Sequence, residues 1–435
     1  MAELTLSFVV FWFALSVLAY VYVGYPLLSW AVRRARPRPV ARSPIEPYVT
    51  VVVVAYNEAH RIGRRIENLL SSDYPRERLK IIVGSDGSTD DTVERASRYE
   101  DQGVTVCDFG QRRGKAAVLN DLIAAADTEI VVLADARQRF EPGAIRALVA
   151  NFADPEVGAV SGELYLRKRS GTSPGGEGTG FYWKYEKFIR ANESWASSTV
   201  GATGAIYAIR RDLFEPIPPD TILDDVLIPM QIVRRGYRVL FEADARAHDL
   251  IAMNPHEDFI RKARTIAGTF QLFARHPWIL NPWRCRVWFK AWSHKALRLA
   301  IPVLHVAVLA ANIALVDMVF YRILLAGQAV FYAAALMGHF QARPERSRRA
   351  RIERRRLERA NLGRRMSMDR RRASRVPKRS PIFTVPYTMC LLGWATIVGF
   401  SRIVARRQRV TWERMPGEPG PRVVSRPNLL LRGKG

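Results

Sequence analysis

Acidic side chains come just after three apolar, β-branched runs of the sequence, at Glu58, Asp86 and Asp135. Carboxylate oxygens gathered in one place are ligands for a divalent cation, which in turn binds phosphate. Asp86 alone, in the sequence Asp-Gly-Ser, is equally typical of a turn that caps a helix. Three acidic run ends together, on a chain of net charge +26, predict a site for a metal ion and a phosphorylated ligand if the fold brings them together.

Basic side chains lie close to these acidic positions in the sequence. Arg112, Arg113 and Lys115 form the cluster Arg-Arg-Gly-Lys between the second and third acidic positions. They offer positive charge to the same anionic ligand, and a plain basic turn is the alternative interpretation.

The elements that must position these residues alternate between strands and helices. The run 49–55 is almost continuously β-branched, which is typical of a strand buried on both faces. Further strands are predicted at 79–84, 104–107 and 129–133, with helices at 62–70, 92–99, 116–126 and 226–234. Such alternation predicts an α/β fold: a mostly parallel, Rossmann-like sheet with helices on both faces and a ligand at the carboxyl ends of the strands.

Long apolar segments flank this domain. Residues 4–32 contain no Asp, Glu, Lys or Arg, and are long enough to cross a hydrocarbon core of about 30 Å. The run is too long for a signal peptide and has no basic residue before it, so a retained anchor is expected. Three more apolar runs, at 300–316, 323–337 and 382–400, predict further membrane helices.

Basic residues indicate which side of the membrane each end faces. Four arginines at positions 33, 34, 36 and 38 follow the first run and place its end in the cytoplasm. The three cysteines are too few and too far apart for a disulfide framework or a zinc site, which fits a reducing compartment. Four full spans would put the tail after residue 400 outside, although its arginines favour the inside, so one run is interfacial or re-entrant.

The segment 343–379 carries 17 Arg or Lys and four Asp or Glu, a net charge of +13. It predicts a cytoplasmic loop that contacts anionic lipid headgroups. Nucleic acid is a poor partner for it because no aromatic residue lies among the arginines to stack on bases. The predicted division of the chain is an anchor with its basic flank (1–44), a cytoplasmic α/β domain (45–295), a membrane hairpin (296–340), the basic loop (341–381), and a last membrane helix with the tail (382–435).

An ordered series of short motifs extends over residues 48–271. Its members are VVVVAYNE (51–58), SDGSTD (85–90), GKAAVLN (114–120), LADA (133–136), GATGAIY (201–207), LDD (223–225) and RKAR (261–264). In this order and spacing they resemble family 2 glycosyltransferases with the GT-A fold, in particular the membrane synthases of poly-N-acetylglucosamine, hyaluronan and cellulose. The resemblance implies a membrane-bound, inverting hexosyltransferase that moves a sugar from a UDP-sugar to a polysaccharide or glycolipid acceptor at the cytoplasmic face of the cell membrane.

The resemblance also implies a role for each matching residue. Those expected to bind the nucleotide-sugar are Tyr56, Glu58 and Asp86 at the uridine, Lys115 at the diphosphate, and Asp135 and Arg261. Asp135 matches the first Asp of an Asp-x-Asp motif that holds Mg²⁺ or Mn²⁺. Asp225 matches the base that deprotonates the acceptor hydroxyl, next to Asp224, and Arg264 matches the arginine that steadies the leaving diphosphate. Without the resemblance, Asp224 and Asp225 would be interpreted as caps of the helix 226–234.

Two residues depart from the family pattern. Arg137 stands where the metal motif has its second Asp, so the metal has fewer protein carboxylates or Arg137 partly replaces it. Thr265 stands where the Gln-x-x-Arg-Trp motif has a Trp that stacks on a growing chain. Non-processive transfer to a lipid-linked acceptor is therefore the alternative activity, and a non-catalytic membrane scaffold is the alternative outside enzymes. Trp183, Tyr185 and Trp195 are candidates for another stacking surface or for ordinary packing.

Overall fold

A computed structural model of the chain describes residues 2–167, 176–250, 255–342 and 380–408. The basic loop 343–379 lies outside these residues. The strands are β1 (Val49–Ala55), β2 (Leu79–Ser85), β3 (Val104–Asp108), β4 (Ile130–Asp135), β5 (Arg139–Phe140), β6 (Val157–Arg167), β7 (Ile206–Arg210) and β8 (Arg238–Leu250). They form one sheet in the order β3-β2-β1-β4-β7-β6-β8-β5.

The first four strands are parallel, as the alternation of strands and helices predicts. β7 pairs antiparallel with β4 and β6, and β5 pairs antiparallel with β8, while β6 and β8 are parallel. The reversed strand β7 lies outside the set of strands that the sequence predicts. In the register, Val54 of β1 faces both Gly84 of β2 and Asp135 of β4, so the ends of three strands are level.

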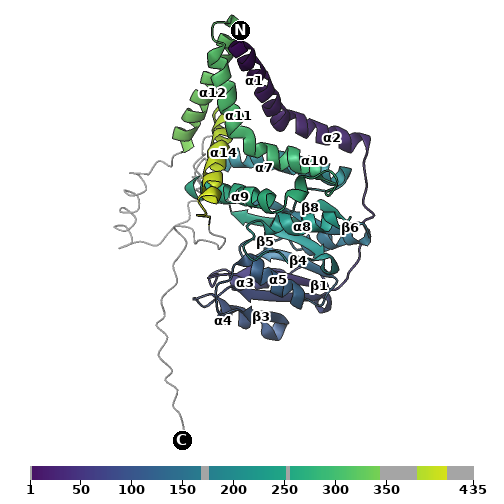
Figure 1. The fold of residues 1–435 in the computed structure, drawn as a ribbon. Coiled ribbons are helices and arrows are strands. Elements are labelled where there is room, and N and C mark those ends of the chain that lie inside the picture. Colours follow the sequence, from purple (N-terminus) through teal and green to yellow (C-terminus); the bar gives the residue numbers. More distant parts are fainter. Residues whose placement is uncertain (1, 168–175, 251–254, 343–379, 409–435) are drawn as a thin grey trace, which may run out of the picture.

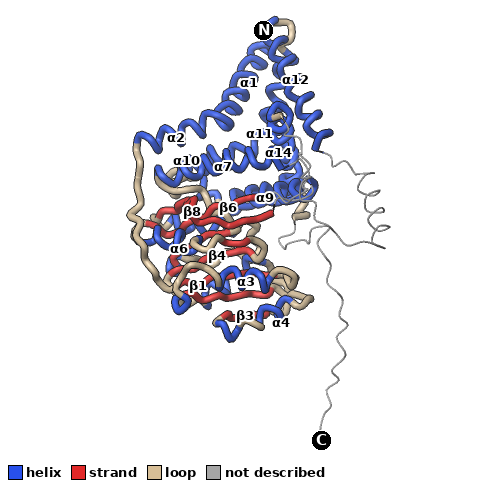
Figure 2. Tube along the Cα trace, turned by 180° about the vertical axis from the view of Figure 1, so that it is seen from behind, coloured by secondary structure: helices blue, strands red, loops and turns tan. Residues whose placement is uncertain are grey.

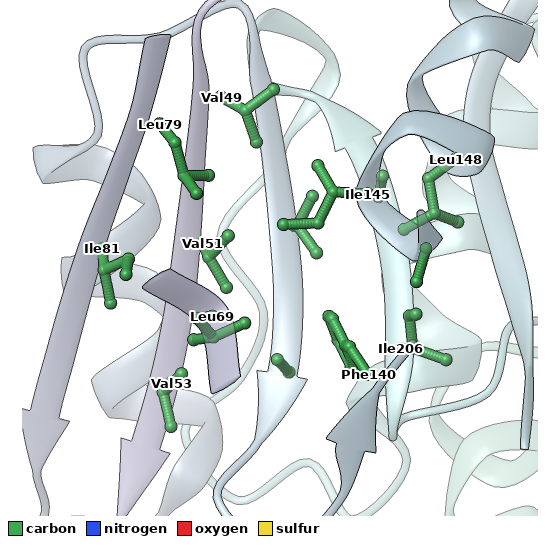
Figure 3. Close-up of a cluster of buried hydrophobic side chains, with 14 of the residues drawn as sticks. Val49, Val51, Val53, Leu69, Leu79, Ile81, Phe140, Ile145, Leu148 and Ile206 are labelled. Atoms are coloured by element: carbon green, nitrogen blue, oxygen red, sulfur yellow. The ribbon is translucent and has the colours of Figure 1, made fainter. Parts of the chain in front are cut away.

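Helices cover both faces of the sheet. α3 (Ile62–Leu70), α4 (Thr92–Ser97) and α6 (Ala144–Val149) bury apolar side chains on one face. Figure 3 shows this core, where Leu69, Ile145 and Leu148 lie over β-branched residues of the strands. α5 (Lys115–Ala125) and α8 (Asp224–Arg234) cover the other face. Because the strands are buried on both sides, almost every residue of β1 is apolar.

The long apolar helices gather at one end of the molecule, away from the strands (Figures 1 and 2). They are α1 (Ala2–Ala19), a π-helical turn η1 (Tyr20–Gly24), α2 (Tyr25–Ala35), α11 (Leu297–Ala314), α12 (Val319–Ala342) and α14 (Pro381–Val404). Among the described residues, four helical stretches are long and apolar enough to cross a membrane: 3–35, 288–314, 319–341 and 381–404. Phe11, Leu18 and Val308 belong to a separate apolar core that α1 and α11 share.

A middle layer joins the long helices to the sheet domain. It contains α7 (Gly176–Ala196), α9 (Pro255–Arg275), α10 (Trp288–Lys290) and the π-helical turn η7 (Ala291–Ala296) (Figure 1). Tyr185 of α7 donates hydrogen bonds to the carbonyls of Val21 and Tyr22, and Trp195 lies under the guanidinium of Arg33. These two aromatic residues therefore pack against the first membrane segment. Of the two roles that the sequence left open, a stacking surface or ordinary packing, the structure supports packing. The remaining one-turn 3₁₀ helices lie at 76–78, 100–102, 150–153, 211–213 and 277–280.

Candidate active site

The polar residues after β1 and β2 are joined by hydrogen bonds. Asn57, with a left-handed φ of 54°, accepts a hydrogen bond from the backbone N–H of Thr89 at 2.7 Å, and its own N–H donates to Ser88 at 3.1 Å. The N–H of Glu58 donates to the hydroxyl of Thr92 at 2.8 Å. The two strand ends therefore form one rigid rim, and Asp86 lies at its base.

Asp86 holds the loop that leads to α5. Its buried carboxylate accepts hydrogen bonds from the backbone N–H groups of Arg113, at 2.6 Å, and Gly114, at 3.0 Å. The same loop places the guanidinium of Arg112 over the ring of Tyr56, 3.8 Å from its centroid. Sequence reasoning gave Asp86 and Tyr56 to the uridine, and the structure puts both at this loop. The carboxylate of Glu58 lies farther along the rim and pairs with Arg61 at 3.2 Å.

The ammonium of Lys115 lies between two carboxylates from different elements. It is 3.0 Å from Asp135, at the end of β4, and 3.1 Å from Asp224, at the start of α8. Burial lowers the pKa of Lys115, but Asp135, Asp224 and Asp225 more than offset this and hold it above its usual value. The structure thus brings together the residues that the sequence placed in three separate motifs.

Asp225 is tied to the loop before β7. One of its carboxylate oxygens accepts a hydrogen bond from the backbone N–H of Gly204 at 3.0 Å. Burial, and then the negative charge of Asp224, raises the pKa of Asp225 to about 6, although Lys115 and Arg190 act in the opposite direction. A carboxylate with a pKa near neutrality is suited to accept a proton at physiological pH.

The capping interpretation of the two aspartates does not match the structure. α8 begins at Asp224 itself instead of at residue 226, and its N-cap, Leu223, has no side-chain hydrogen bond. Asp224 contacts Lys115, and Asp225 contacts Gly204, so both carboxylates point to groups outside their own helix.

Arg264 approaches the same carboxylates from α9. Burial lowers the pKa of its guanidinium, while Asp224, Asp225 and Asp135 raise it, so the group stays charged. α9 is held in place because Gln271 accepts a hydrogen bond from the N–H of Ile222 at 3.0 Å and Arg275 pairs with Asp220 at 2.6 Å. Arg261 lies on the same helix, about one turn before Arg264.

Arg137 has a partner of its own. Its guanidinium pairs with the buried carboxylate of Asp249 at 2.5 Å, and Gln138 donates to the same oxygen at 3.1 Å. The sequence offered no sign of this pair because the two residues are more than 100 positions apart. The charge of Arg137 therefore neutralises Asp249 at the end of β8.

Three further residues of this region were missed by sequence reasoning. Arg190 of α7 donates to the hydroxyl of Thr203 at 2.6 Å and contributes positive charge to Asp225. Tyr207 of β7 is fully buried, and burial, followed by Asp224, raises the pKa of its hydroxyl. Arg65 of α3 is buried against the ring of Phe140, 4.0 Å from its centroid, and its charge acts on Asp135. Arg190 and Arg65 lie in no motif, and Tyr207 ends the 201–207 motif without an expected role, so tertiary packing alone shows that the three belong to this region.

Asp135 and Asp224 could supply only one or two ligands to a divalent ion. Among the described residues, no group of three or more His, Cys, Asp or Glu is spaced to hold a metal. The Lys115 ammonium between Asp135 and Asp224 shows that a cation is accepted there. One or two carboxylates, completed by phosphate oxygens of a substrate, are the usual ligands of Mg²⁺.

A mixed sheet with level strand ends, two cations and three carboxylates at one edge defines a GT-A-type domain. A comparison with protein families agrees with this: residues 50–217 match the family model described as glycosyl transferase family 2. Residues 50–217 are thus a glycosyl transferase family 2 domain.

Similar proteins extend the comparison beyond that domain. The chain is 28% identical over 199 residues to poly-beta-1,6-N-acetyl-D-glucosamine synthase of Staphylococcus aureus (strain COL), covering 45% of this chain and 48% of that protein. It is 23% identical over 235 residues to the Staphylococcus epidermidis synthase of the same name, covering 53% and 56%. The chain thus spans about half the length of the curated relatives it matches.

One solved structure resembles nearly the whole chain. It is the mannosyltransferase PcManGT from Pyrobaculum calidifontis in complex with GDP-Man and Mn²⁺, with a TM-score of 0.63 and 24% identity, covering 92% of this chain and 99% of that one. This likeness shows that the GT-A-type sheet and the apolar helices form a fold that occurs in other proteins.

Proposed function

We propose that the protein is a membrane-bound, inverting glycosyltransferase that moves a sugar from a nucleoside diphosphate sugar to a glycan or lipid-linked acceptor. The observation that carries this proposal is the half-buried carboxylate of Asp225, held by Gly204 beside two cations from separate elements. A base of pKa about 6 next to positive charge suits removal of a proton from a hydroxyl while a phosphate leaves.

The reaction would be a single displacement. The acceptor hydroxyl oxygen attacks the anomeric carbon, the bond from that carbon to the diphosphate oxygen breaks, and the hydroxyl proton passes to Asp225. The configuration is inverted because the attack comes from the face opposite the leaving group. Lys115 and Arg264 are the groups that would stabilise the negative charge developing on the diphosphate.

A divalent cation, Mg²⁺ or Mn²⁺, would be held by Asp135 and the donor phosphates and would supply further charge stabilisation. In the ligand-free chain Lys115 neutralises Asp135 and Asp224. When the donor binds, Lys115 is free to exchange one of these contacts for a phosphate oxygen. The charge balance of the site is thereby kept in both states.

The donor is proposed to be a UDP-sugar, and the tyrosine and aspartate that would receive the uridine, Tyr56 and Asp86, both lie at the 112–114 loop. The proposed location is the cell membrane, with the catalytic domain on the cytoplasmic side, where nucleotide-sugars are made. The arginines that follow the first apolar segment support this orientation. Thr265 in place of a stacking Trp favours non-processive transfer as the second candidate, and the anionic lipids at the basic loop remain a proposed partner.

The test is release of nucleoside diphosphate by the purified chain in detergent. A panel of donors, including UDP-GlcNAc, UDP-Glc and GDP-Man, is assayed with and without Mg²⁺ or Mn²⁺, and the Asp225→Asn variant serves as the matched control. Release with one donor that needs a divalent ion and is lost in the variant supports the proposal. Tight donor binding with no release under any of these conditions, acceptor glycans included, would favour the scaffold interpretation instead.

A further inference from the structure

The first apolar segment is longer than a membrane requires. Residues 3–35 form one helical stretch, and at about 1.5 Å per residue it would extend roughly 50 Å, against a hydrocarbon core of about 30 Å. The helix changes direction at the π-helical turn η1, Tyr20–Gly24, and α2 turns away from α1 (Figures 1 and 2). The stretch is therefore two helices with different directions.

One face of α2 is fixed to the middle layer. Tyr25 and Ser29 are buried on this face, and the hydroxyl of Tyr25 donates to Glu193 of α7 at 2.5 Å. His294 of η7 lies 2.9 Å from Glu193 and 2.9 Å from Glu186, which extends the contact to the start of the second membrane segment. Burial raises the pKa of Glu186, but the charges of His294 and its basic neighbours hold it well below the usual value, so the cluster is ionic.

The opposite face of α2 is apolar and exposed. Leu27 is 57% exposed, and Trp30, three residues further along the same side of the helix, is 50% exposed. Two exposed arginines, Arg34 and Arg36, follow at the end of the helix. An apolar stripe with a Trp, ending in arginines, is the pattern of a helix that lies at the boundary between lipid chains and headgroups.

We propose that α2 lies in the headgroup layer of the bilayer, with its exposed stripe toward the lipid chains and its arginines at anionic headgroups. Continuity with α1 favours lipid over a protein partner, because the membrane segment ends within one turn of this face. Through the contacts of Tyr25 and His294, α2 would fix the depth of the middle layer, and so of α7 and the sheet domain below it. The proposal does not depend on the catalytic one.

Spin labels on the full-length chain in nanodiscs test this placement. The native cysteines are first replaced (Cys107→Ser, Cys285→Ala, Cys390→Ser), and single cysteines are introduced by Leu27→Cys and Trp30→Cys. Phe13→Cys, at a 65% exposed site of α1, is the reference for the hydrocarbon core, and Tyr48→Cys, at a 55% exposed site before β1, is the reference for water. Relative accessibility to oxygen and to a water-soluble nickel complex reports the depth of each label.

The labels at 27 and 30 should lie between the two references, and Arg34→Glu with Arg36→Glu should shift them toward water in vesicles containing phosphatidylserine. Labels as deep as the one at 13 would mean that α2 continues the span, and labels as accessible to nickel as the one at 48 would mean that it faces water. Strong dipolar coupling between labels at 27 in nanodiscs with two copies, absent with one, would assign the stripe to a second chain. Each of these three results overturns the proposal.

Discussion

Gly204 donates its backbone N–H to Oδ2 of Asp225 at 3.0 Å, which connects the loop before β7 with the first turn of α8. This bond sets the orientation of the proposed base. Replacing Asp225 with Asn keeps the shape of the side chain and removes its basicity. We expect a loss of transfer of about 10²–10⁴-fold with little change in donor affinity, measured by steady-state kinetics and by donor titration. Transfer within about tenfold of wild type would contradict the assignment.

The pH dependence of kcat/KM provides a separate test of the same residue. Only the ionised carboxylate accepts a proton, so its raised pKa means that activity is present above about pH 6 and is lost as the pH falls through that value. Below it we expect a drop of about tenfold per pH unit. The residual activity of Asp225→Asn should lack this inflection, and an identical acid limb in the variant would assign it to another group.

Gly204→Ala tests the position of the base without changing its chemistry. A Cβ at this residue would lie 3.0 Å from Oδ2 of Asp225, closer than ordinary van der Waals contact, so the carboxylate must shift by a few tenths of an ångström. We expect kcat to fall about tenfold, because small misplacements of a catalytic group are costly, with the donor KM unchanged. Gly143→Ala is the matched control, since a Cβ there meets nothing within 4 Å. Equal kinetics for the two variants would argue against this geometry.

Lys115→Met removes the cation between Asp135 and Asp224. The donor KM should rise because the diphosphate loses a partner, and the acid limb of the pH profile should move to higher pH because the charge of Lys115 lowers the pKa of Asp225. Both changes are read from kcat/KM profiles of wild type and variant. A raised KM with an unmoved limb would separate the phosphate role of Lys115 from its effect on the base.

Chelation tests the divalent ion. Since Asp135 is the only match to the metal motif, we expect EDTA to abolish transfer, Mg²⁺ or Mn²⁺ to restore it, and the affinity to be lower than two carboxylates would give. Arg137→Ala should keep this dependence, because Arg137 pairs with Asp249. Full activity after thorough chelation, lost in Arg137→Ala, would show that the arginine replaces the ion.

Deleting the basic loop 343–379, with a short polar linker in its place, tests its predicted role at the lipid surface. Its arginines are each worth about 1 kcal/mol near an anionic leaflet. Diphosphate release in detergent should therefore stay nearly unchanged, while the deleted chain should bind anionic vesicles less well. A loss of more than about tenfold in the same micelles would mean that the loop reaches the active site.

The parallel half of the fold could be predicted from sequence because its strands are buried on both faces. The predicted strands at 49–55, 79–84, 104–107 and 129–133 agree with β1 to β4 within a residue or two. β6 and β8 were not predicted, because their pairing spans about 80 residues and is interrupted by register shifts. The first apolar segment, predicted at 4–32, lies within the helical stretch 3–35, but its continuous apolarity gave no indication of the π-helical turn η1.

The candidate site was predictable where motifs lie at the ends of strands or the starts of helices. Asp135 ends β4, Lys115 and Asp225 lie in the first turns of α5 and α8, and the topology brings them together with Arg264. Partners from distant elements left no sign in the sequence: Asp249 for Arg137, and Arg190 for Thr203. Such pairs depend on packing between elements, which periodicity and spacing do not report.

Gly399 of α14 lies directly against the main chain of α9, where a Cβ would be 3.0 Å from both the carbonyl of Ala263 and the amide of Ala267. One residue further, Phe400 packs on Phe270 with ring centroids 5.2 Å apart. Because Gly399 has no side chain, the backbones of α9 and α14 are in direct contact here. A sliding movement of α9, which carries Arg264, must therefore displace α14 as well. A movement of α9 would therefore shift α14 within the bilayer, where hydrophobic mismatch costs fractions of a kcal/mol per ångström. We therefore expect the turnover rate to depend on bilayer thickness, even when the chemistry at Asp225 is unchanged.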